Sequence, residues 1–206
     1  MSGVTAPDTV KRTRRAELLD LAADLFAERG LRATTVRDIA DSAGILSGSL
    51  YHHFDSKEAM VDEILRGFLD DLFGRYREIA TAGLSSRETL EALVIASYEA
   101  FDRHHAAVAI YQAEAKNLRD VDRFGYIRDF NTEFRDLWHR VLTAGVADGS
   151  FRPELDVELA FRFLRDTVWV AVRWYTPGGP ITVKNLAQQY LTIVLDGLTV
   201  PESSPK

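Results

Sequence analysis

The amino-acid sequence predicts an all-α protein of about nine helices, and three observations lead to this prediction. Apolar residues recur three or four positions apart along most of the 206-residue chain, as they do on one face of a helix. Hydroxyl and acidic residues stand three apart at expected helix starts, which is the spacing of a capping box. No pair of strand-like segments, long low-complexity tract or repeat of fixed period accompanies them.

The first helix is expected over residues 11–29, with an apolar stripe that Gly30 brings to an end. The start of this helix carries a basic cluster, formed by Lys11, Arg12, Arg14 and Arg15. Positive charge at a helix N-terminus opposes the helix dipole and is locally unfavourable. Nearby DNA phosphates would offset this cost, and a solvated basic turn is the alternative explanation.

Residues 31–57 contain two short helices joined by a tight turn. Thr35 and Asp38 have the spacing of a capping box for the first helix. Gly44 supplies the turn, because glycine adopts positive φ at little steric cost. The second helix, residues 47–54, turns two apolar residues inward and leaves its Ser, Tyr and His side chains outside. A short helix held across a glycine turn is the geometry that enters the major groove of DNA, and the alternative is an ordinary helical hairpin.

The remaining helices are separated by glycine, proline and capping residues. A long helix is expected to be capped by Asp55 or Ser56 and to reach about Ala80. The next is expected over residues 85–118, with a break near residues 103–105. The last three are expected over residues 126–147, 156–175 and 182–198.

Charge is divided unevenly along the chain, whose formal net charge is −6. Residues 1–57 hold eight Lys and Arg against eight Asp and Glu, and residues 58–206 hold 17 against 23. Only the face that meets phosphate needs to be positive, so this balance is compatible with DNA binding. The chain has no cysteine, no membrane-spanning run and no signal-peptide pattern, and we therefore expect a cytoplasmic protein without a membrane partner.

The sequence offers little support for an enzyme or a metal site. The histidines form adjacent pairs at 52–53 and 104–105, plus the isolated His139, and none has the i,i+4 spacing of a zinc-binding helix. A nucleophile elbow, a glycine-rich phosphate loop and a cysteine nucleophile are all absent. We therefore expect no catalytic residues, no metal and no cofactor.

The expected helix over residues 156–175 is apolar on two faces. One face can pack within its own domain and the other against a second subunit, with the last helix sharing that contact. The alternative is a monomer in which both faces are internal. The residues expected in the subunit interface are Phe163, Val170, Trp174, Tyr190 and Val194.

Between the two apolar faces lies a stripe that contains Arg162, Arg165 and Arg173. Buried arginines are costly without an anion, which is supplied either by an internal salt-bridge network or by an acidic ligand. Trp169 follows Arg165 by one helical turn, so a cation and a broad ring face the same space. This pairing suits a large acidic ligand with an apolar ring end. The expected ligand contacts are Arg165 and Trp169, followed by Arg162, Tyr98, Phe101 and Tyr111.

The segment AERGLRATTVRDIADSAGILSGSLYHHFDSKEAM resembles the helix-turn-helix of the TetR family of bacterial transcriptional regulators. The matching features are the Phe26…Gly30 helix end, Thr34-Thr35, Ile39-Ala40, Ala43-Gly44, Gly48, Leu50-Tyr51, Phe54 and Ser56-Lys57-Glu58. The family often places serine and a basic residue just after the turn, where this chain has Leu46 and Ser47. The resemblance implies a homodimer that binds a palindromic operator through the second helix of the motif. Residues 1–57 would form the DNA-binding domain, and residues 58–206 the ligand-binding and dimerisation domain.

The residues expected to bind double-stranded operator DNA fall into three groups. The expected phosphate contacts are Thr35, Tyr51 and Lys57; the expected base-edge contacts are Ser47, Ser49 and His52; and Arg12 and Arg14 are expected to reach an adjacent groove.

A narrower resemblance covers three further segments. GILSGSLYHHF, RDTVWVAVRWYTPGGP and QQYLTIVL resemble the actinobacterial members of the family that repress the later, C/D-ring stage of cholesterol catabolism. This resemblance implies an operator in sterol-degradation genes and release by an acyl-CoA effector, the coenzyme A thioester of a ring-opened sterol fragment. Three alternatives stay open: a regulator of another lipid or aromatic pathway, a constitutive DNA-binding protein without a ligand, and an acyl-thioester enzyme that carries this head.

Overall fold

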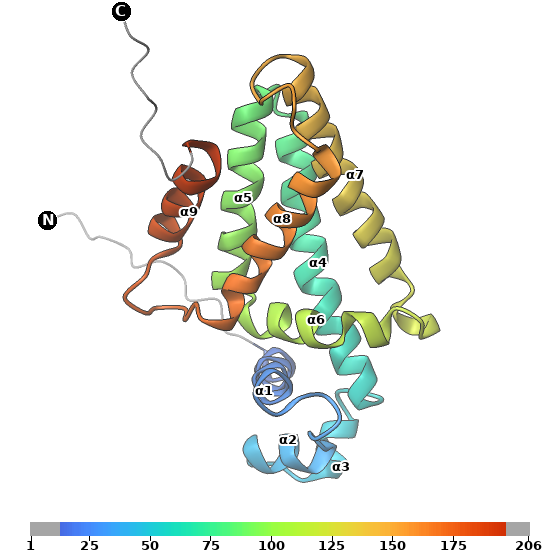
Figure 1. The fold of residues 1–206 in the computed structure, drawn as a ribbon. Helices are drawn as coiled ribbons and strands as arrows, with labels where there is room; N and C mark the ends of the chain where they lie inside the picture. Colours follow the sequence, from blue (N-terminus) through green and yellow to red (C-terminus); the bar gives the residue numbers. More distant parts are fainter. Residues whose placement is uncertain (1–12, 197–206) are drawn as a thin grey trace, which may run out of the picture. The chain divides into compact units, whose positions relative to one another are not determined.

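The computed structural model describes residues 13–196, and over this range the chain is helical without a strand (Figure 1). The nine α-helices of this range are α1 Arg14–Arg29, α2 Val36–Ser42, α3 Ser47–Tyr51, α4 Lys57–Thr81, α5 Ser86–Arg103, α6 His105–Leu118, α7 Tyr126–Ala147, α8 Val157–Val170 and α9 Val183–Leu191. Short turns complete them: the 3-10 turns η1 Asp122–Phe124 and η2 Ala171–Arg173, and the π-turn η3 Thr192–Asp196. The all-α prediction is confirmed.

The chain divides into two compact units between Ile64 and Leu65, so α4 contributes residues to both. The DNA-binding domain was predicted to end at residue 57, where α4 begins. The first packing unit extends two helical turns further. An ion pair between Arg15 of α1 and Glu63 of α4 ties these turns to the rest of the first unit. We call this first unit the head.

The head is built on capped helix ends. The Thr13 side chain accepts a hydrogen bond from the Ala16 amide, so α1 begins at Arg14 and not at Lys11, and residues 11 and 12 lie outside the described range. Thr34 is fully buried, and its hydroxyl donates to the carbonyl of Gly30 at 2.9 Å. The buried apolar side chains that join α1, α2 and α3 include Leu18, Ala22, Phe26, Ile39 and Leu50.

The second unit is a helical bundle in which α5 packs against α7, α8 and α9, while α6 crosses its end (Figure 1). A capping box formed by Ser85 and Glu88 starts α5, as its sequence spacing predicts. The chain breaks between α5 and α6 at His104, whose φ is −127° and ψ is 34°. This confirms the break expected near residues 103–105. None of the helices between residues 13 and 196 is long and apolar enough to cross a membrane.

One helix ends earlier than its apolar pattern predicts. The helix expected to reach Tyr175 stops at Val170, because the chain tightens into η2. The backbone amides of Trp174 and Tyr175 both donate to the carbonyl of Ala171, at 3.1 and 2.9 Å. Arg173 and Trp174 therefore leave the α-helical wheel on which their positions were predicted.

Candidate DNA-binding surface and effector cavity

A glycine turn fixes α3 after α2. The Ile45 amide donates to the carbonyl of Ala40 at 3.0 Å, and Gly44 between them has a φ of +67°. A bond from an amide to the carbonyl five residues back, with glycine in the left-handed region, is the Schellman ending of a helix. The turn predicted at Gly44 is confirmed, and it sets the direction in which α3 leaves α2.

The second helix of the motif is shorter than expected. α3 ends at Tyr51, whereas the sequence pattern extended it to residue 54. The amides of His52 and His53 donate to carbonyls three residues back, which tightens and ends the helix. Leu50 and Phe54 are buried as expected, at 1% and 4% exposure, and they anchor the segment to the head.

The exposed side chains of this segment differ in part from those expected to reach base edges. Ser47 and Ser49 are half-buried, while His52 is exposed. Tyr51, expected at a phosphate, is 55% exposed. Leu46, which the sequence analysis did not include among the DNA contacts, is 80% exposed at the N-cap of α3. The signal that could have found it is its departure from the serine that the family often has there.

Lys57 and Thr35, both expected at phosphates, already have partners within the head. The Lys57 ammonium donates to the carbonyls of Leu31 and Thr34, at 2.7 and 3.0 Å. One of its three N–H groups remains for a phosphate. The Thr35 hydroxyl donates to the Asp38 carboxylate at 2.6 Å, and this bond holds the pKa of Asp38 below its ordinary value. Thr35 thus serves in the confirmed capping box, and its phosphate contact stays a prediction.

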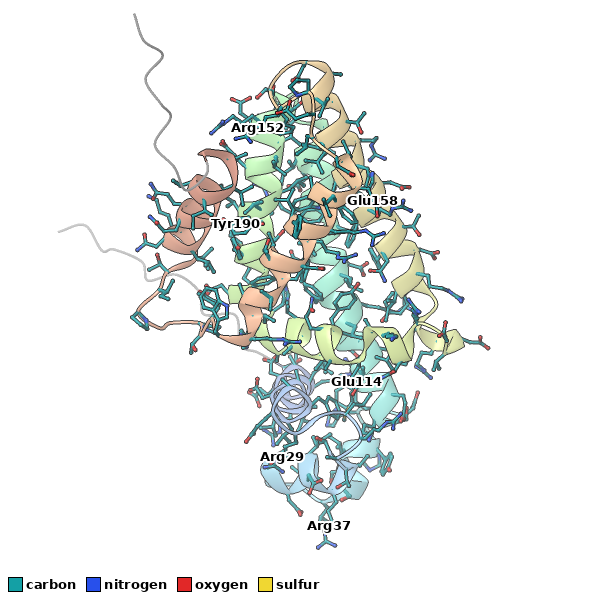
Figure 2. All side chains as sticks on the ribbon, viewed as in Figure 1. Arg29, Arg37, Glu114, Arg152, Glu158 and Tyr190 are labelled. Carbon is teal, nitrogen blue, oxygen red and sulfur yellow. The ribbon has the colours of Figure 1, made fainter. Side chains whose placement is uncertain are left out.

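The arginines of the head differ in how firmly the head holds them. Arg14 donates to the carbonyl of Ala43 at 2.9 Å, which ties α1 to the turn after α2. Arg12 lies outside the described residues. Arg37 of α2 has an 83% exposed side chain, paired at 3.5 Å with the similarly open Asp41. Figure 2 shows Arg37 extending away from the helices. Arg37 was not among the predicted DNA contacts, although its place in the first turn of α2 was a signal.

The second unit contains a cavity of about 290 Å³, lined by α4, α6, α7, α8 and η2. It is a candidate ligand site, and we call it the effector cavity. Its apolar lining consists of Leu69, Leu72, Phe73, Phe134, Trp169 and Val170. Its polar lining consists of Tyr111, Gln112, Asn131, Arg165, Asp166 and Arg173. Sites for small ligands usually measure about 300–1,000 Å³ and combine apolar walls with a few polar groups, so this cavity is a small member of that class.

Trp169 is held in place by aromatic neighbours and is only 7% exposed. Its ring centroid lies 5.3 Å from that of Phe101 and 6.1 to 6.2 Å from those of Phe68, Tyr111 and Phe134. Offset and edge-on contacts at these separations favour a fixed ring. The cavity therefore has a flat apolar wall of defined orientation.

Tyr111 gives the cavity a fixed polar group. Burial raises the pKa of Tyr111 to about 12, so its hydroxyl stays protonated at neutral pH. This hydroxyl donates to the side-chain oxygen of Asn131 at 2.7 Å, which leaves the amide hydrogens of Asn131 for another acceptor. Of the weaker ligand candidates, Tyr111 is the one that lines the cavity.

The arginine stripe of α8 divides between two environments. Arg165 and Arg173 line the effector cavity. Arg165 donates to the neighbouring Asp166 at 2.7 Å, whereas Arg173 has no acidic partner among the described residues. Arg162 does not line the cavity and pairs with Glu158 at 2.7 Å. The alternative of an internal salt-bridge network therefore explains Arg162, but it does not explain Arg173.

Glu158 lies close to Arg162 and to two other basic side chains on the outside of the bundle. It lies 3.0 Å from His139 and 3.5 Å from Arg135, both on α7. The hydrogen bond from Arg162 is the main cause that lowers the pKa of Glu158. Tertiary packing therefore gives His139 an acidic neighbour that its place in the sequence does not show.

Tyr98 and Phe101 were expected to touch the ligand, but they lie in the core and do not line the cavity. Their exposures are 1% and 0%. Both come from α5, the helix at the centre of the bundle, so their rings are covered on every side. Phe101 supports Trp169 at 5.3 Å, and Tyr98 packs edge-on against Tyr190.

Exposed apolar side chains gather on α8, η3 and the turn after η2. Those expected in the subunit interface are Phe163 at 63% exposure, Trp174 at 55%, Val170 at 43% and Val194 at 38%. Leu159 and Ile193 extend the set at 49% and 50%. Tyr190 differs, because it is half-buried and its hydroxyl bonds the Thr167 hydroxyl of α8 at 2.7 Å. Large exposed apolar patches are typical of contact surfaces.

The geometry of the head defines a helix-turn-helix protein, since a short helix with exposed side chains follows a glycine turn. Residues 18–64 match the family described as bacterial regulatory proteins, tetR family. Residues 83–198 match the tetracyclin repressor-like, C-terminal domain. The chain belongs to the TetR family of bacterial regulatory proteins, and the resemblance seen in its sequence is confirmed. Members of this family bind operator DNA, typically as dimers.

Several relatives carry one name. The chain is 71% identical to HTH-type transcriptional repressor KstR2 of Rhodococcus jostii (strain RHA1), over 98% of this chain and 100% of that one. It is 62% identical to KstR2 of Mycobacterium tuberculosis (strain ATCC 25618 / H37Rv), over 91% of this chain and 94% of the relative. A solved structure, that of the ketosteroid transcriptional regulator KstR2 of Mycobacterium tuberculosis, has a TM-score of 0.88 at 61% identity and covers 92% of this chain and 96% of that chain. These relatives are transcriptional repressors and not enzymes.

Proposed function

We propose that this chain is a cytoplasmic, ligand-responsive repressor that binds a palindromic operator as a homodimer and controls sterol-degradation genes. Its effector is a coenzyme A thioester of a ring-opened sterol fragment. The relatives named KstR2, one of them a ketosteroid transcriptional regulator, support the pathway. The observation that carries the ligand class is the cavity in which Arg165 and Arg173 accompany Trp169.

The lining of the effector cavity suits the two ends of such a thioester. Arginine binds carboxylate or phosphate through a planar fork, and a tryptophan face covers a flat or fused ring. The volume of about 290 Å³ accommodates the ring end alone, so the nucleotide end extends outside. Arg173, which has no acidic partner among residues 13–196, is the natural contact for its phosphates.

The route from the effector to the head runs through α4. Leu69, Leu72 and Phe73 of this helix line the cavity, and its residues 57–64 belong to the head. An effector that favours one placement of α4 shifts the population of heads able to bind DNA. Coupling of this kind is usually worth about 1–3 kcal/mol, or roughly 5- to 150-fold in affinity.

Dimerisation is supported by the apolar set on α8, η3 and the turn after η2. Phe163 and Trp174 expose more than half of their surface, at 63% and 55%. A two-fold contact buries the same surface on both subunits, so one such set serves both partners. Two heads related by this axis then read two half-sites of a palindrome.

The test is a gel shift with the DNA upstream of the chain's own gene. We expect retardation by the protein alone and release by the sterol-fragment thioester, whereas free coenzyme A and the free acid leave the complex intact. Chromatography of the incubated thioester should recover it unchanged, since the chain is a regulator. Retardation that no thioester affects would favour a constitutive DNA-binding protein.

A further inference from the structure

Leu46 stands in an unfavourable place for a leucine. It is 80% exposed, the largest exposure among the large apolar side chains of residues 13–196. It also occupies the N-cap of α3, where its side chain makes no capping hydrogen bond. Serine, threonine, asparagine or aspartate would cap the helix and stabilise it. The head therefore gains neither burial nor a cap from this leucine.

Gly48 lies two residues further on, at a position where the fold does not require a glycine. It lies inside α3, and its φ is not positive. A Cβ atom built on it meets no atom within 4 Å, so alanine would fit. Glycine inside a helix is less stable than alanine. Its absent side chain leaves room for something outside the chain.

A single exposed leucine on a protein surface needs no explanation by itself. Here two unfavourable choices lie within three residues, at the start of the helix that follows the glycine turn. In a helix-turn-helix, residues at this end of the second helix meet the edges of the bases. The two serines of the same helix, Ser47 and Ser49, are half-buried and less available than Leu46.

We infer that Leu46 reads a thymine in the operator by packing against its 5-methyl group, and that Gly48 lets the helix approach the groove closely enough for this contact. Apolar side chains distinguish thymine in the major groove through this methyl group, which no other base carries there. The contact is made by the leucine side chain and adds a specificity-determining residue to the polar ones. The inference rests on the proposed binding of an operator by the head.

Uracil in place of thymine removes the methyl group and leaves every hydrogen-bonding atom unchanged. The upstream DNA of the chain's own gene is therefore amplified twice. One product is made with thymidine triphosphate and the other with deoxyuridine triphosphate. Burial of one methyl group corresponds to about fourfold in affinity, so two half-sites give about 15-fold. The parent protein should bind the uracil DNA more weakly by about this factor.

The decisive quantity is the ratio of the affinity for thymine DNA to the affinity for uracil DNA, measured for each variant. Leu46→Ala and Leu46→Ser should bind thymine DNA about 15-fold more weakly, and their ratios should fall towards one. Leu46→Ser restores a capping residue, so its melting temperature should equal or exceed that of the parent and exclude a folding defect. Gly48→Ala should also melt no lower than the parent while binding both DNAs more weakly.

A Leu46→Ser variant that keeps the parent's full thymine-to-uracil ratio would overturn the inference. So would a Gly48→Ala variant that binds thymine DNA as tightly as the parent. Parent protein that binds neither DNA in preference to unrelated sequence would instead overturn the proposed operator, and this inference with it.

Discussion

Lys57 is bonded within the head, and we predict that it also contacts a DNA phosphate. Two of its N–H groups bind the carbonyls of Leu31 and Thr34, and one remains. We expect Lys57→Ala to weaken binding to all sequences and to reduce the slope of log affinity against log salt by about one unit for each phosphate that the side chain neutralises. Titrations at several salt concentrations measure this slope.

Arg37→Ala is the control for stability alone, because Arg37 is itself a candidate DNA contact. Its side chain is 83% exposed and pairs with Asp41 at 3.5 Å, so its removal should leave the melting temperature unchanged. Lys57→Ala should lower the melting temperature, because the loop before α2 loses two hydrogen bonds. An unaltered salt slope in Lys57→Ala would contradict the phosphate assignment and leave Lys57 with its structural role alone.

The capping box of α2 predicts a dependence of stability on pH. The hydrogen bond from Thr35 lowers the pKa of Asp38 below its ordinary value of 3.8. A carboxylate with a lowered pKa contributes stability above its ordinary pKa, and this contribution is lost as the pH falls through the folded-state pKa. The parent should thus be more stable than Asp38→Asn at neutral pH, and the difference should shrink below about pH 4. Thermal melts of both proteins between pH 3 and pH 7 test this, and a constant difference would contradict it.

Residue-level predictions succeeded where the neighbouring sequence decides the outcome. The Thr35–Asp38 box and the Gly44 turn depend on residues three or four apart, and both are present. The outward face of α3 was less predictable, because burial of Ser47 and Ser49 depends on how the head packs around a helix of five residues. Leu46 was not predicted as a DNA contact, because a leucine is usually expected to be buried in the core.

At the scale of elements, α8, η3 and the turn after η2 carry the proposed subunit contact. Trp174 is 55% exposed in the single chain, and Trp174→Glu would bury a charge in an apolar interface. We expect this variant to sediment as a monomer at micromolar concentration and to lose operator affinity. Val121→Glu is the control, since Val121 is also exposed, at 49%, but lies between α6 and η1. A Trp174→Glu variant that stays dimeric would move the interface to another face.

Two helical glycines predict opposite effects of the same substitution. A Cβ on Gly145 of α7 would overlap the ring of Phe151, whereas a Cβ on Gly74 of α4 meets nothing within 4 Å. Gly145→Ala should therefore lower the free energy of unfolding by about 1–3 kcal/mol through overpacking. Gly74→Ala should raise it by up to about 1 kcal/mol through helix propensity. Urea unfolding measures both, and a neutral Gly145→Ala would mean that Phe151 moves aside without cost.

The sequence predicted the order of the helices correctly, but it predicted their ends less accurately. Glycine and capping residues mark most boundaries, as Gly30 does for α1 and Ser85 for α5. The apolar pattern of α8 continues through residue 175, so nothing in that pattern indicates the tighter turn at η2. Arg173 lies within this turn and lines the cavity.

For the whole molecule, the cavity was the least predictable feature. Its lining draws residues from between Leu69 and Arg173, on four α-helices and a turn. Arg165 and Trp169 were predicted to face one space because they stand one helical turn apart, and both line the cavity, whereas their contact with a ligand stays a prediction. Tyr98 and Phe101 have equally suitable side chains, but only packing reveals that α5 buries them in the core.

The proposed coupling between cavity and operator gives the broadest test. Arg165 and Arg173 line the cavity, whereas Arg162 pairs with Glu158 outside it, so the same substitution at all three separates ligand binding from a general change of charge. Arg165→Met should leave operator binding intact and abolish release by the thioester, and Arg173→Met should weaken release. Arg162→Met should respond as the parent does.

Calorimetry then measures thioester binding without DNA. Trp169→Leu removes the flat wall but keeps an apolar side chain, so it should weaken binding of the ring end while the head still binds operator. Because coupling is reciprocal, the parent bound to operator should also bind the thioester more weakly, by the same roughly 5- to 150-fold factor that the thioester imposes on DNA. If Arg165→Met and Trp169→Leu both bind the thioester as tightly as the parent, the effector lies elsewhere, and this part of α8 serves only to hold the bundle together.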